Sequence, residues 1–299
     1  MHYKVLGKSD LKVSTTSFGC KSLPATNPEE SIQLLQQAFT NGINYFDTAD
    51  LYDKGENEKL VGQAFRENRH QVIIATKVGN QWRTDGSGWD WNPRKEYILK
   101  AVEGSLQRLQ TDYLDLYQLH GGTLDDPIDE TIETFELLKQ QGKIRNYGIS
   151  SIRPNVIREY IKRSNIVSVM MQYSLLDRRP EETVLDLLQE NQIGVVTRGS
   201  LAQGLLAGKP PKTYLGYSEQ EVKKVIEAIQ NLVTDNLSMA DVAVQYVLHH
   251  PAVASTVLGI RTQTQLQEAL YIPNAEALSN NNLNFLQQSL HPLLYEQHR

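Results

Sequence analysis

Residues 43–77 begin with Ile43-Asn44-Tyr45-Phe46-Asp47 and end with Val72-Ile73-Ile74-Ala75-Thr76-Lys77, and a helix is expected between them around residues 58–67. Both outer runs are short and apolar, which is typical of strands buried on both faces of a parallel sheet. Each run ends in a charged residue, and in such sheets ligands and chemistry collect at the carboxyl ends of the strands. The stretch therefore predicts both a fold class and the edge of the sheet that carries a functional site.

The same alternation of strand and helix continues through the chain. No linker, low-complexity tract or shift in composition interrupts it, so we predict a single domain over residues 1–299 with an α/β fold, a (β/α)8 TIM barrel. A doubly wound open sheet is the competing architecture, but it usually has fewer strands and a Gly-rich first turn, and the sequence contains no G-x-G-x-x-G. The expected strands are residues 15–19, 43–47, 72–78, 115–120, 144–150, 167–174, 194–198 and 255–259.

Local signals mark the helices that follow these strands. Asn27 and Pro28 are typical of a helix cap and first helical residue, and Gly42 is typical of the end of that helix. Extra helices are expected before the last strand and near residues 279–290 at the carboxyl end. The other expected helices are 128–141, 154–163 and 180–191, with further starts at Asn92-Pro93, at Ser218 with Glu221, at Ser238, and at Thr262 with Gln265.

The first residues do not fit the repeat. Short alternating runs at 3–6 and 11–13 flank Gly7-Lys8-Ser9-Asp10, which predicts a β-hairpin. We expect this hairpin to plug the amino-terminal end of the barrel.

Composition narrows the class of protein. The chain is 40% hydrophobic and 22% charged, with a net charge of −5, a mean hydropathy of −0.43 and a pI near 5.8. These values argue against a general nucleic-acid binder and a polybasic membrane patch, and no apolar run approaches the ~20 residues of a membrane span. Cys20 is the one cysteine, and the first residues lack the apolar core of a signal peptide, so we expect a cytoplasmic protein. No Cys/His cluster suggests a metal site.

Polar residues of four chemical kinds lie at or just after the ends of three expected strands. They are Asp47, Tyr52 shortly after it, Lys77 and His120. An acid, a phenol, an ammonium and an imidazole at successive strand ends predict one shared proton-transfer site.

With these residues in place, the sequence resembles the aldo-keto reductase superfamily. The matching segments are Gly42-Ile43-Asn44-Tyr45-Phe46-Asp47-Thr48-Ala49-Asp50-Leu51-Tyr52 with Glu58 and Gly62, then residues 75–77, 115–120, 142–150 and 203–209, and the similarity covers nearly the whole chain. The resemblance implies an NAD(P)H-dependent carbonyl reductase on a (β/α)8 barrel, acting on a small-molecule carbonyl substrate.

The chemistry of the four residues agrees with that implication. A tyrosine hydroxyl is a weak acid at neutral pH, and we expect the Lys77 ammonium to lower the pKa of Tyr52 toward a useful value. Asp47 would hold Lys77 charged and oriented, and His120 would orient the carbonyl oxygen by donating a hydrogen bond. The resemblance assigns the same roles, with Tyr52 as general acid.

The resemblance also implies a set of cofactor contacts. Strand ends would hold the nicotinamide carboxamide, the loop after residue 199 would wrap the pyrophosphate through backbone N–H groups, and Arg261 could bind a 2′-phosphate, which favours NADPH over NADH. Ser151 and Ala269 stand where the family usually has Asn, and neither side chain carries an amide. The implied cofactor residues are Ser150, Gln172, Arg198, Ser200, Leu201, Gln203, Gly204, Leu205, Gly259, Arg261, Gln265 and Glu268.

Arg198 departs from the family pattern, which usually has an aromatic residue stacked on the nicotinamide ring. Its guanidinium could lie over the ring, reach the pyrophosphate or meet an anionic group of the substrate. For the substrate, the insertion from Asn80 to Lys95 carries Trp82, Trp89 and Trp91, and we expect a tryptophan of this loop, Trp82 first, to join His120 in the pocket wall. The sequence does not name the substrate.

Two other functions stay open. The first is a redox-sensing, nicotinamide-binding regulatory subunit with slow turnover, because some barrels of this family act in that way. The second is a Schiff-base aldolase that uses Lys77, since a strand-end lysine in a (β/α)8 barrel is what that chemistry needs. We expect a monomer without nucleic-acid or membrane partners.

Overall fold

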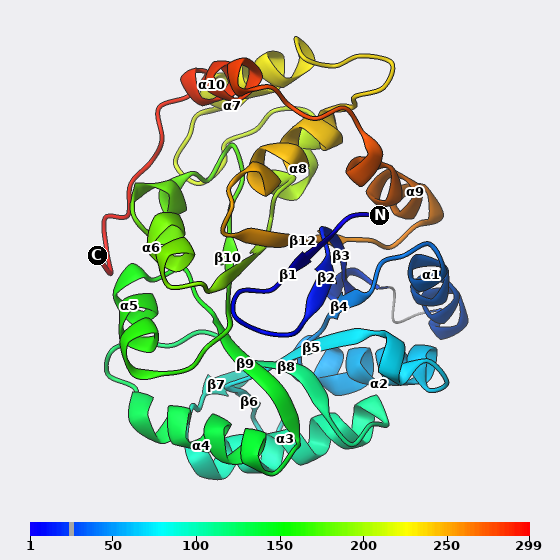
Figure 1. The fold of residues 1–299 in the computed structure, drawn as a ribbon, viewed down its shortest axis with the longest axis vertical. Helices are drawn as coiled ribbons and strands as arrows, with labels where there is room; N and C mark the ends of the chain where they lie inside the picture. Colours follow the sequence, from blue (N-terminus) through cyan, green and yellow to red (C-terminus); the bar gives the residue numbers. More distant parts are fainter. Residues whose placement is uncertain (24–26) are drawn as a thin grey trace.

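A closed barrel of eight parallel strands forms the centre of the computed structural model, which describes residues 1–23 and 27–299 (Figure 1). The predicted (β/α)8 architecture is confirmed, and the ends of the strands differ from the expected ones by no more than two residues. In order round the barrel the strands are β10 (Ser168–Gln172), β11 (Gly194–Arg198), β12 (Val253–Gly259), β3 (Thr16–Gly19), β4 (Tyr45–Asp47), β5 (Ile73–Val78), β8 (Leu114–Leu119) and β9 (Ile144–Ser150).

Helices surround the barrel, and side chains cap several of them as expected. The Asn27 side chain accepts a hydrogen bond from the Glu30 N–H, and Ser218 and Ser238 each form a capping box; such a cap is worth about 1 kcal/mol. The predicted extra helices are α7, which precedes the last strand together with α8, and α10, which contacts α7. The helices are α1 (Pro28–Thr40), α2 (Glu56–Phe65), α3 (Lys95–Leu109), α4 (Ile128–Gln140), α5 (Pro154–Arg163), α6 (Val184–Glu190), α7 (Glu219–Gln230), α8 (Met239–His249), α9 (Gln263–Tyr271) and α10 (Asn280–Gln288).

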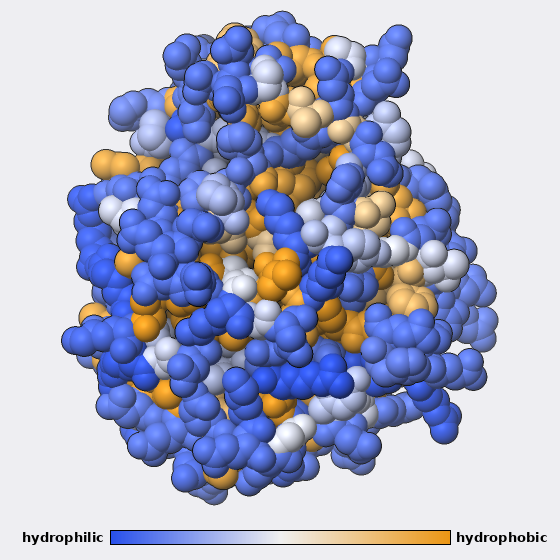
Figure 2. Space-filling view, in the orientation of Figure 1, coloured by the Kyte–Doolittle hydropathy of each residue, from blue (hydrophilic) through white to orange (hydrophobic). Residues whose placement is uncertain are grey.

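The amino-terminal hairpin, β1 (Tyr3–Val5) with β2 (Lys12–Ser14), lies across the barrel opening that faces the viewer in Figure 1. Leu6, Leu11 and Val13 are buried in one cluster with side chains from inside the barrel, among them Leu116 and Val196. Apolar side chains gather toward the centre of this face, and its margin is polar (Figure 2). The hairpin therefore closes the amino-terminal end of the barrel, as predicted, and leaves the carboxyl ends of the strands for a site.

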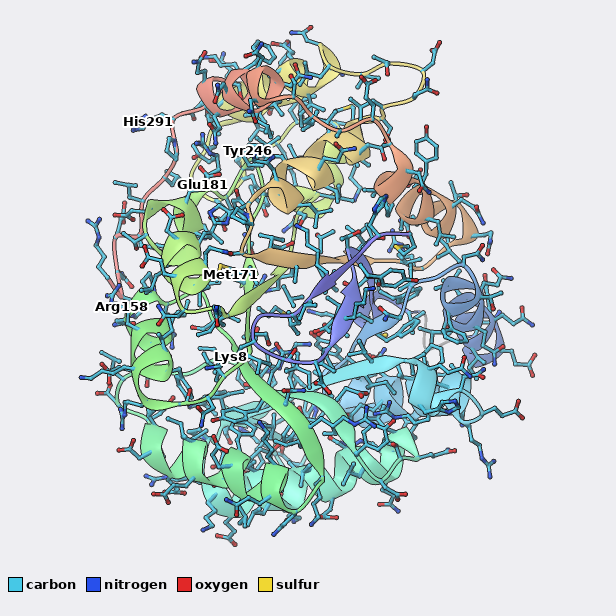
Figure 3. All side chains as sticks on the ribbon, viewed as in Figure 1. Lys8, Arg158, Met171, Glu181, Tyr246 and His291 are labelled. Carbon is cyan, nitrogen blue, oxygen red and sulfur yellow. The ribbon has the colours of Figure 1, made fainter. Side chains whose placement is uncertain are left out.

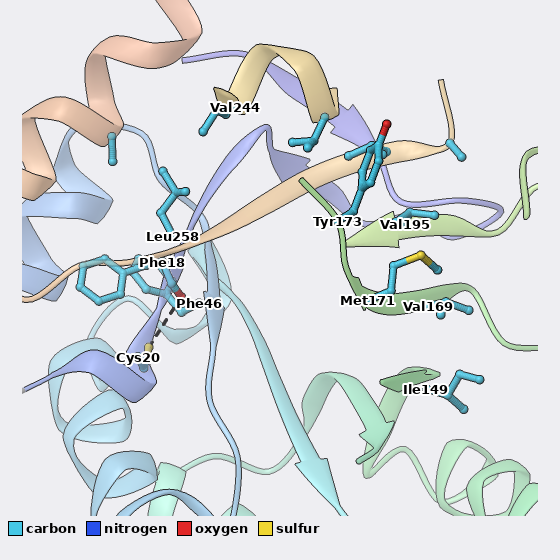
Figure 4. Close-up of a cluster of buried hydrophobic side chains, with 14 of the residues drawn as sticks. Phe18, Cys20, Phe46, Ile149, Val169, Met171, Tyr173, Val195, Val244 and Leu258 are labelled. Atoms are coloured by element: carbon cyan, nitrogen blue, oxygen red, sulfur yellow. Dashed lines mark hydrogen bonds between the residues drawn. The ribbon is translucent and has the colours of Figure 1, made fainter. Parts of the chain in front are cut away.

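A larger apolar layer lies between the strands and the helices. Phe18 and Phe46 on neighbouring strands are fully buried there (Figure 4), and the Phe46 ring packs on that of Phe65 from α2 with 4.3 Å between centroids. Truncating a buried phenylalanine of this kind costs about 3–5 kcal/mol. This packing fixes β3 and β4, and with them the position of Asp47.

The expected helix over residues 180–191 is interrupted. A short 3₁₀ turn, Arg179–Glu182, precedes α6, and Thr183 between them has φ −157°. Glu181 accepts hydrogen bonds from the hydroxyls of Tyr173, at 2.9 Å, and Tyr246, at 2.5 Å (Figure 3). The bond from Tyr246 holds the turn against α8, and the bond from Tyr173 ties it to the residue that follows β10.

The insertion after β5 is a second hairpin, which the sequence did not predict. β6 (Asn80–Trp82) pairs antiparallel with β7 (Trp89–Trp91). Across the described part of the chain, no helix is both long enough and apolar enough to span a bilayer.

Candidate active site

A pocket of about 710 Å³ lies at the carboxyl ends of the barrel strands. Lys77 comes from β5, His120 directly follows β8, and Arg198 ends β11, while Tyr52 lies on the turn after β4. Asp47 lies immediately behind, in contact with Lys77. The four residues predicted to share one site are therefore brought together.

Lys77 and Asp47 form a buried ion pair. The Lys77 Nζ is 2.7 Å from each carboxylate oxygen of Asp47 and 2.7 Å from the carbonyl oxygen of Thr48, so its three N–H groups match three acceptors. The Lys77 side chain is 1% exposed. Burial alone would lower the pKa of Lys77, but Asp47 and then Tyr52 more than offset it, so the net pKa is raised and the ammonium stays charged.

Tyr52 begins a 3₁₀ turn, Tyr52–Gly55, in which Asp53 and Lys54 have φ of 48° and 55°. Left-handed backbone of this kind costs on the order of 1 kcal/mol or more per residue and is common at functional sites. The Tyr52 ring centroid is 5.3 Å from the Lys77 Nζ. Burial raises the pKa of Tyr52, and although Lys77 opposes this, the net direction is upward. The expectation of a lowered pKa was therefore wrong for this state of the protein, because desolvation outweighs the ammonium.

His120 faces Tyr52 edge-on, with 6.0 Å between the ring centroids. Burial, followed by the charges of Lys77, Arg198 and Lys21, lowers the pKa of His120 to about 3. The imidazole is thus neutral at any working pH. Its Nδ1 is buried and has no hydrogen-bond partner among the residues that the structure describes.

Asp50 is a further buried polar group, to which the sequence analysis gave no role. It lies behind the four residues predicted to share one site, which we call the tetrad. Asp50 is 8% exposed, and its Oδ2 accepts a hydrogen bond of 3.4 Å from the Tyr97 hydroxyl. Burial, followed by the charge of Glu58, raises the pKa of Asp50 to about 8. Glu58 is fully buried and is paired with Arg108. The only sequence signal for Asp50 was its place between Asp47 and Tyr52.

Three of the predicted cofactor residues lie together at the strand ends. Ser150 and Arg198 line the pocket. Gln172 and Arg198 are register partners on β10 and β11, and an Arg198 guanidinium N–H donates to the Gln172 Oε1 at 3.0 Å. The Gln172 Nε2 donates to the Tyr214 hydroxyl at 3.4 Å. Ser151 is buried, and its backbone N–H donates to the Met170 carbonyl oxygen at 2.9 Å.

The loop after β11 forms a tight turn with left-handed backbone. Gln203 and Gly204 have φ of 61° and 92°, and a Cβ at Gly204 would lie 2.8 Å from the Lys209 Cε. The Ser200 hydroxyl is buried in a hydrogen-bonded chain with Thr197 and Thr256, at 3.0 and 2.7 Å, so it faces the barrel wall. The backbone N–H groups of Ser200 and Leu201 have no acceptor among residues 1–23 and 27–299. The Leu205 side chain is buried.

The remaining predicted cofactor residues lie outside the pocket, at the end of β12 and the start of α9. Arg261 is exposed, and its backbone N–H donates to the Gln265 Oε1 at 3.0 Å. Gly259 ends β12, and Gln265 and Glu268 lie on α9, with Glu268 exposed. These positions form a surface separate from the proton-transfer site.

The tryptophan expected first in the pocket is not one of its described lining residues. Trp82 on β6 lies against Lys54, whose Nζ is 5.2 Å from the ring centroid. Trp89 and Trp91, on the returning strand β7, line the pocket instead, and the Trp91 Nε1 donates to Asp126 at 3.0 Å. Trp89 and Trp91 therefore lie at the pocket in place of Trp82, because the insertion folds as a hairpin that the sequence did not predict.

Comparisons with known proteins agree with the fold. The sequence matches the aldo/keto reductase family over residues 15–289. It is 51% identical to an uncharacterised oxidoreductase, YqkF, of Bacillus subtilis (strain 168), with both chains covered completely. It is 30% identical to the NADH-specific methylglyoxal reductase of Escherichia coli (strain K12), with 88% of this chain and 90% of that protein covered. The holo form of aldo-keto reductase AKR11C1 from Bacillus halodurans has a TM-score of 0.95 and 49% identity, with 100% and 99% covered.

The chain belongs to the aldo/keto reductase family and is an oxidoreductase of that family. Among the described residues, no group of three or more His, Cys, Asp or Glu side chains could hold a metal ion.

Proposed function

We propose that this chain reduces small aldehydes or ketones with a hydride from NADPH, and that Tyr52 donates the proton. The observation that carries the proposal is the convergence of the buried Lys77–Asp47 pair, Tyr52 and a neutral His120 on one pocket. Such a reduction adds a hydride to the carbonyl carbon and a proton to the carbonyl oxygen. The side chains of this pocket suit the transfer of the proton to the carbonyl oxygen.

Tyr52 is protonated before the reaction, because its pKa is raised by burial. As the carbonyl oxygen gains negative charge, the hydroxyl proton moves to that oxygen and the charge passes to the phenolate. The Lys77 ammonium stabilises the phenolate, and Asp47 holds the ammonium in place. His120, being neutral, orients the carbonyl oxygen by donating one N–H. Solvent then returns the proton to Tyr52.

The cofactor supplies the hydride when it is bound, and the polar groups around the pocket suit it. The N–H groups of Ser200 and Leu201, which have no acceptor in the described part of the chain, and the left-handed turn at Gln203 and Gly204 suit a pyrophosphate, since successive backbone N–H groups bind anions. We assign the nicotinamide carboxamide to Ser150 and Gln172. In both strands these residues are the last before the loop.

NADPH is proposed over NADH on the strength of Arg261. Its exposed guanidinium lies at the start of α9 beside the Thr262 cap, where a 2′-phosphate could meet both the guanidinium and the helix N-terminus. A relative with 30% identity is named as NADH-specific, so likeness to that protein does not favour NADPH, and Arg261 alone supports it.

The aldolase alternative is disfavoured by the ion pair. A Schiff base forms only from a neutral amine, whereas Asp47 and Tyr52 together raise the pKa of Lys77 against the effect of burial, and its three N–H groups have acceptors. A redox-sensing regulatory subunit would use the same pocket and would differ from a reductase only in its slow turnover.

The test is a fluorescence titration with NADPH and NADH, followed by a panel of aldehydes and ketones assayed by loss of reduced cofactor. Binding with multiple turnovers supports the proposal. Tight binding without turnover on any carbonyl compound would favour the sensing role. Borohydride trapping of a substrate on Lys77 would favour the aldolase.

A further inference from the structure

The candidate pocket carries a strong excess of positive charge. Lys21, Lys77, Arg153 and Arg198 line it, and no aspartate or glutamate does so among the described residues. Only Lys77 of these four has an ion-pair partner in the described part of the chain. This excess is local, since the whole chain has a net charge of −5.

Lys21 stands out among these cations by its position. It lies in the short 3₁₀ turn Cys20–Ser22, directly after β3. Its Nζ is 5.6 Å from the Tyr52 ring centroid, nearly the same distance as the Lys77 Nζ at 5.3 Å. Lys77 has three acceptors, whereas Lys21 is exposed and has neither hydrogen bond nor ion pair among residues 1–23 and 27–299.

The charge of Lys21 acts on His120, the residue proposed to orient the carbonyl oxygen. It is one of the charges that lower the pKa of His120, and it lies beside the proposed proton donor. A carbonyl oxygen bound by the Tyr52 hydroxyl would lie about 2.7 Å from it. A carboxylate one or two carbons from that carbonyl would then come within reach of a flexible lysine side chain.

We propose that Lys21 is a specificity-determining residue that binds a carboxylate on the substrate, so that the preferred substrates are oxo acids with the carboxylate close to the carbonyl group. This proposal rests on the proposed carbonyl reduction. Arg153 extends the same positive wall. One of its guanidinium N–H groups donates to the Gly122 carbonyl oxygen, which holds the side chain at the pocket.

Two other roles for Lys21 give different results. A contact with a phosphate of the cofactor would change the dissociation constant of NADPH. An effect on the acidity of Tyr52 would change turnover of every substrate, charged or neutral. Binding of a substrate carboxylate changes only the substrates that carry one.

The experiment compares phenylglyoxylate, whose carboxylate is adjacent to the ketone, with its methyl ester, which has the same ketone and no charge. For Lys21→Met we expect kcat/KM for the acid to fall about tenfold or more, because a charge-assisted contact is lost. The ester should change by less than about twofold. Lys21→Arg should retain most of the preference for the acid. Lys8→Met is the control, since it removes one charge from the hairpin at the opposite end of the barrel.

Several results would overturn the proposal. Equal losses of kcat/KM for the acid and the ester would show that Lys21 acts on the acidity of Tyr52. A larger dissociation constant for NADPH in Lys21→Met would show that Lys21 binds the cofactor. Reduction of the ester by the wild type without reduction of the acid would also reject it, and would leave the carbonyl reductase intact. Turnover of neither compound, nor of any simple aldehyde, would reject the proposed function itself.

Discussion

The raised pKa of Asp50 predicts an unusual dependence of stability on pH. Asp50 is buried behind the tetrad, its Oδ1 has no partner among the described residues, and the hydrogen bond to its Oδ2 is long, at 3.4 Å. Burial, followed by the charge of Glu58, raises the pKa to about 8, against about 3.9 in an unfolded chain. The folded protein therefore binds a proton here that the unfolded protein releases.

The sign of the effect follows from this difference. Between about pH 4 and pH 8 the folded state holds more protons than the unfolded state, so this group lowers the free energy of unfolding as pH rises. The slope for one proton is about 1.4 kcal/mol per pH unit. Asn has the shape of Asp and no charge, so Asp50→Asn should remove the slope. Relative to wild type, the variant should gain about 2.5 kcal/mol between pH 5.5 and 7.5 and almost nothing further above about pH 8.5.

The assay is urea unfolding of wild type and Asp50→Asn at pH 5.5, 6.5, 7.5 and 8.5, at constant ionic strength. A constant difference between the proteins, such as one caused by the new amide, cancels when values at two pH values are compared. Asp125→Asn, at an exposed position, is the matched control and should follow wild type. Parallel pH profiles for wild type and Asp50→Asn would refute the reasoning, because they would mean that Asp50 is ionised in the folded protein.

Three further predictions concern the proposed reaction. Tyr52→Phe should lower kcat by about 10²–10⁴ while leaving the NADPH dissociation constant nearly unchanged, and a variant with most of its activity in a carbonyl reductase assay would remove Tyr52 from the mechanism. Arg261→Ala should weaken NADPH binding about tenfold or more with little change for NADH, as measured by titration with both cofactors; equal losses would contradict reading of the 2′-phosphate. Arg198→Tyr should tighten NADP⁺ relative to NADPH by a small factor, since stacking is worth about 0.5–1.5 kcal/mol; titration at two salt concentrations checks this, and an unchanged ratio would place Arg198 away from the ring.

Most of the fold could be predicted because its signals are local. Apolar runs of strand length, helix caps such as Asn27 and Ser218, and the alternation of the two kinds of element each depend on a few neighbouring residues. A parallel barrel then requires the ends of its strands to meet at one edge. That requirement is why Asp47, Lys77 and His120 could be grouped before any distance was known.

The predictions from the sequence failed where residues distant in the chain decide the local structure. Trp82 and Trp89 are joined by pairing of β6 with β7, and the Gly-containing segment between them gave no strand signal. The helix over 180–191 breaks at Thr183 because Tyr173 and Tyr246, from other elements, hold Glu181. Asp50 is a polar residue of an ordinary kind whose burial depends on Glu58, Tyr97 and the barrel wall.

The pKa of Tyr52 also depends on the fold and could not be predicted from residue types alone. Residue types alone place an ammonium beside a phenol and predict a lowered pKa, whereas the fold adds desolvation that raises it. For the proposed general acid this outcome is favourable, because the phenol keeps its proton until the substrate oxygen becomes basic. In the proposed reaction the Lys77 charge would act most strongly on the phenolate, which forms only as the reaction proceeds, so it would stabilise the transition state more than the ground state. Since three acceptors already fix the ammonium at 2.7 Å, little reorganisation is needed at that moment.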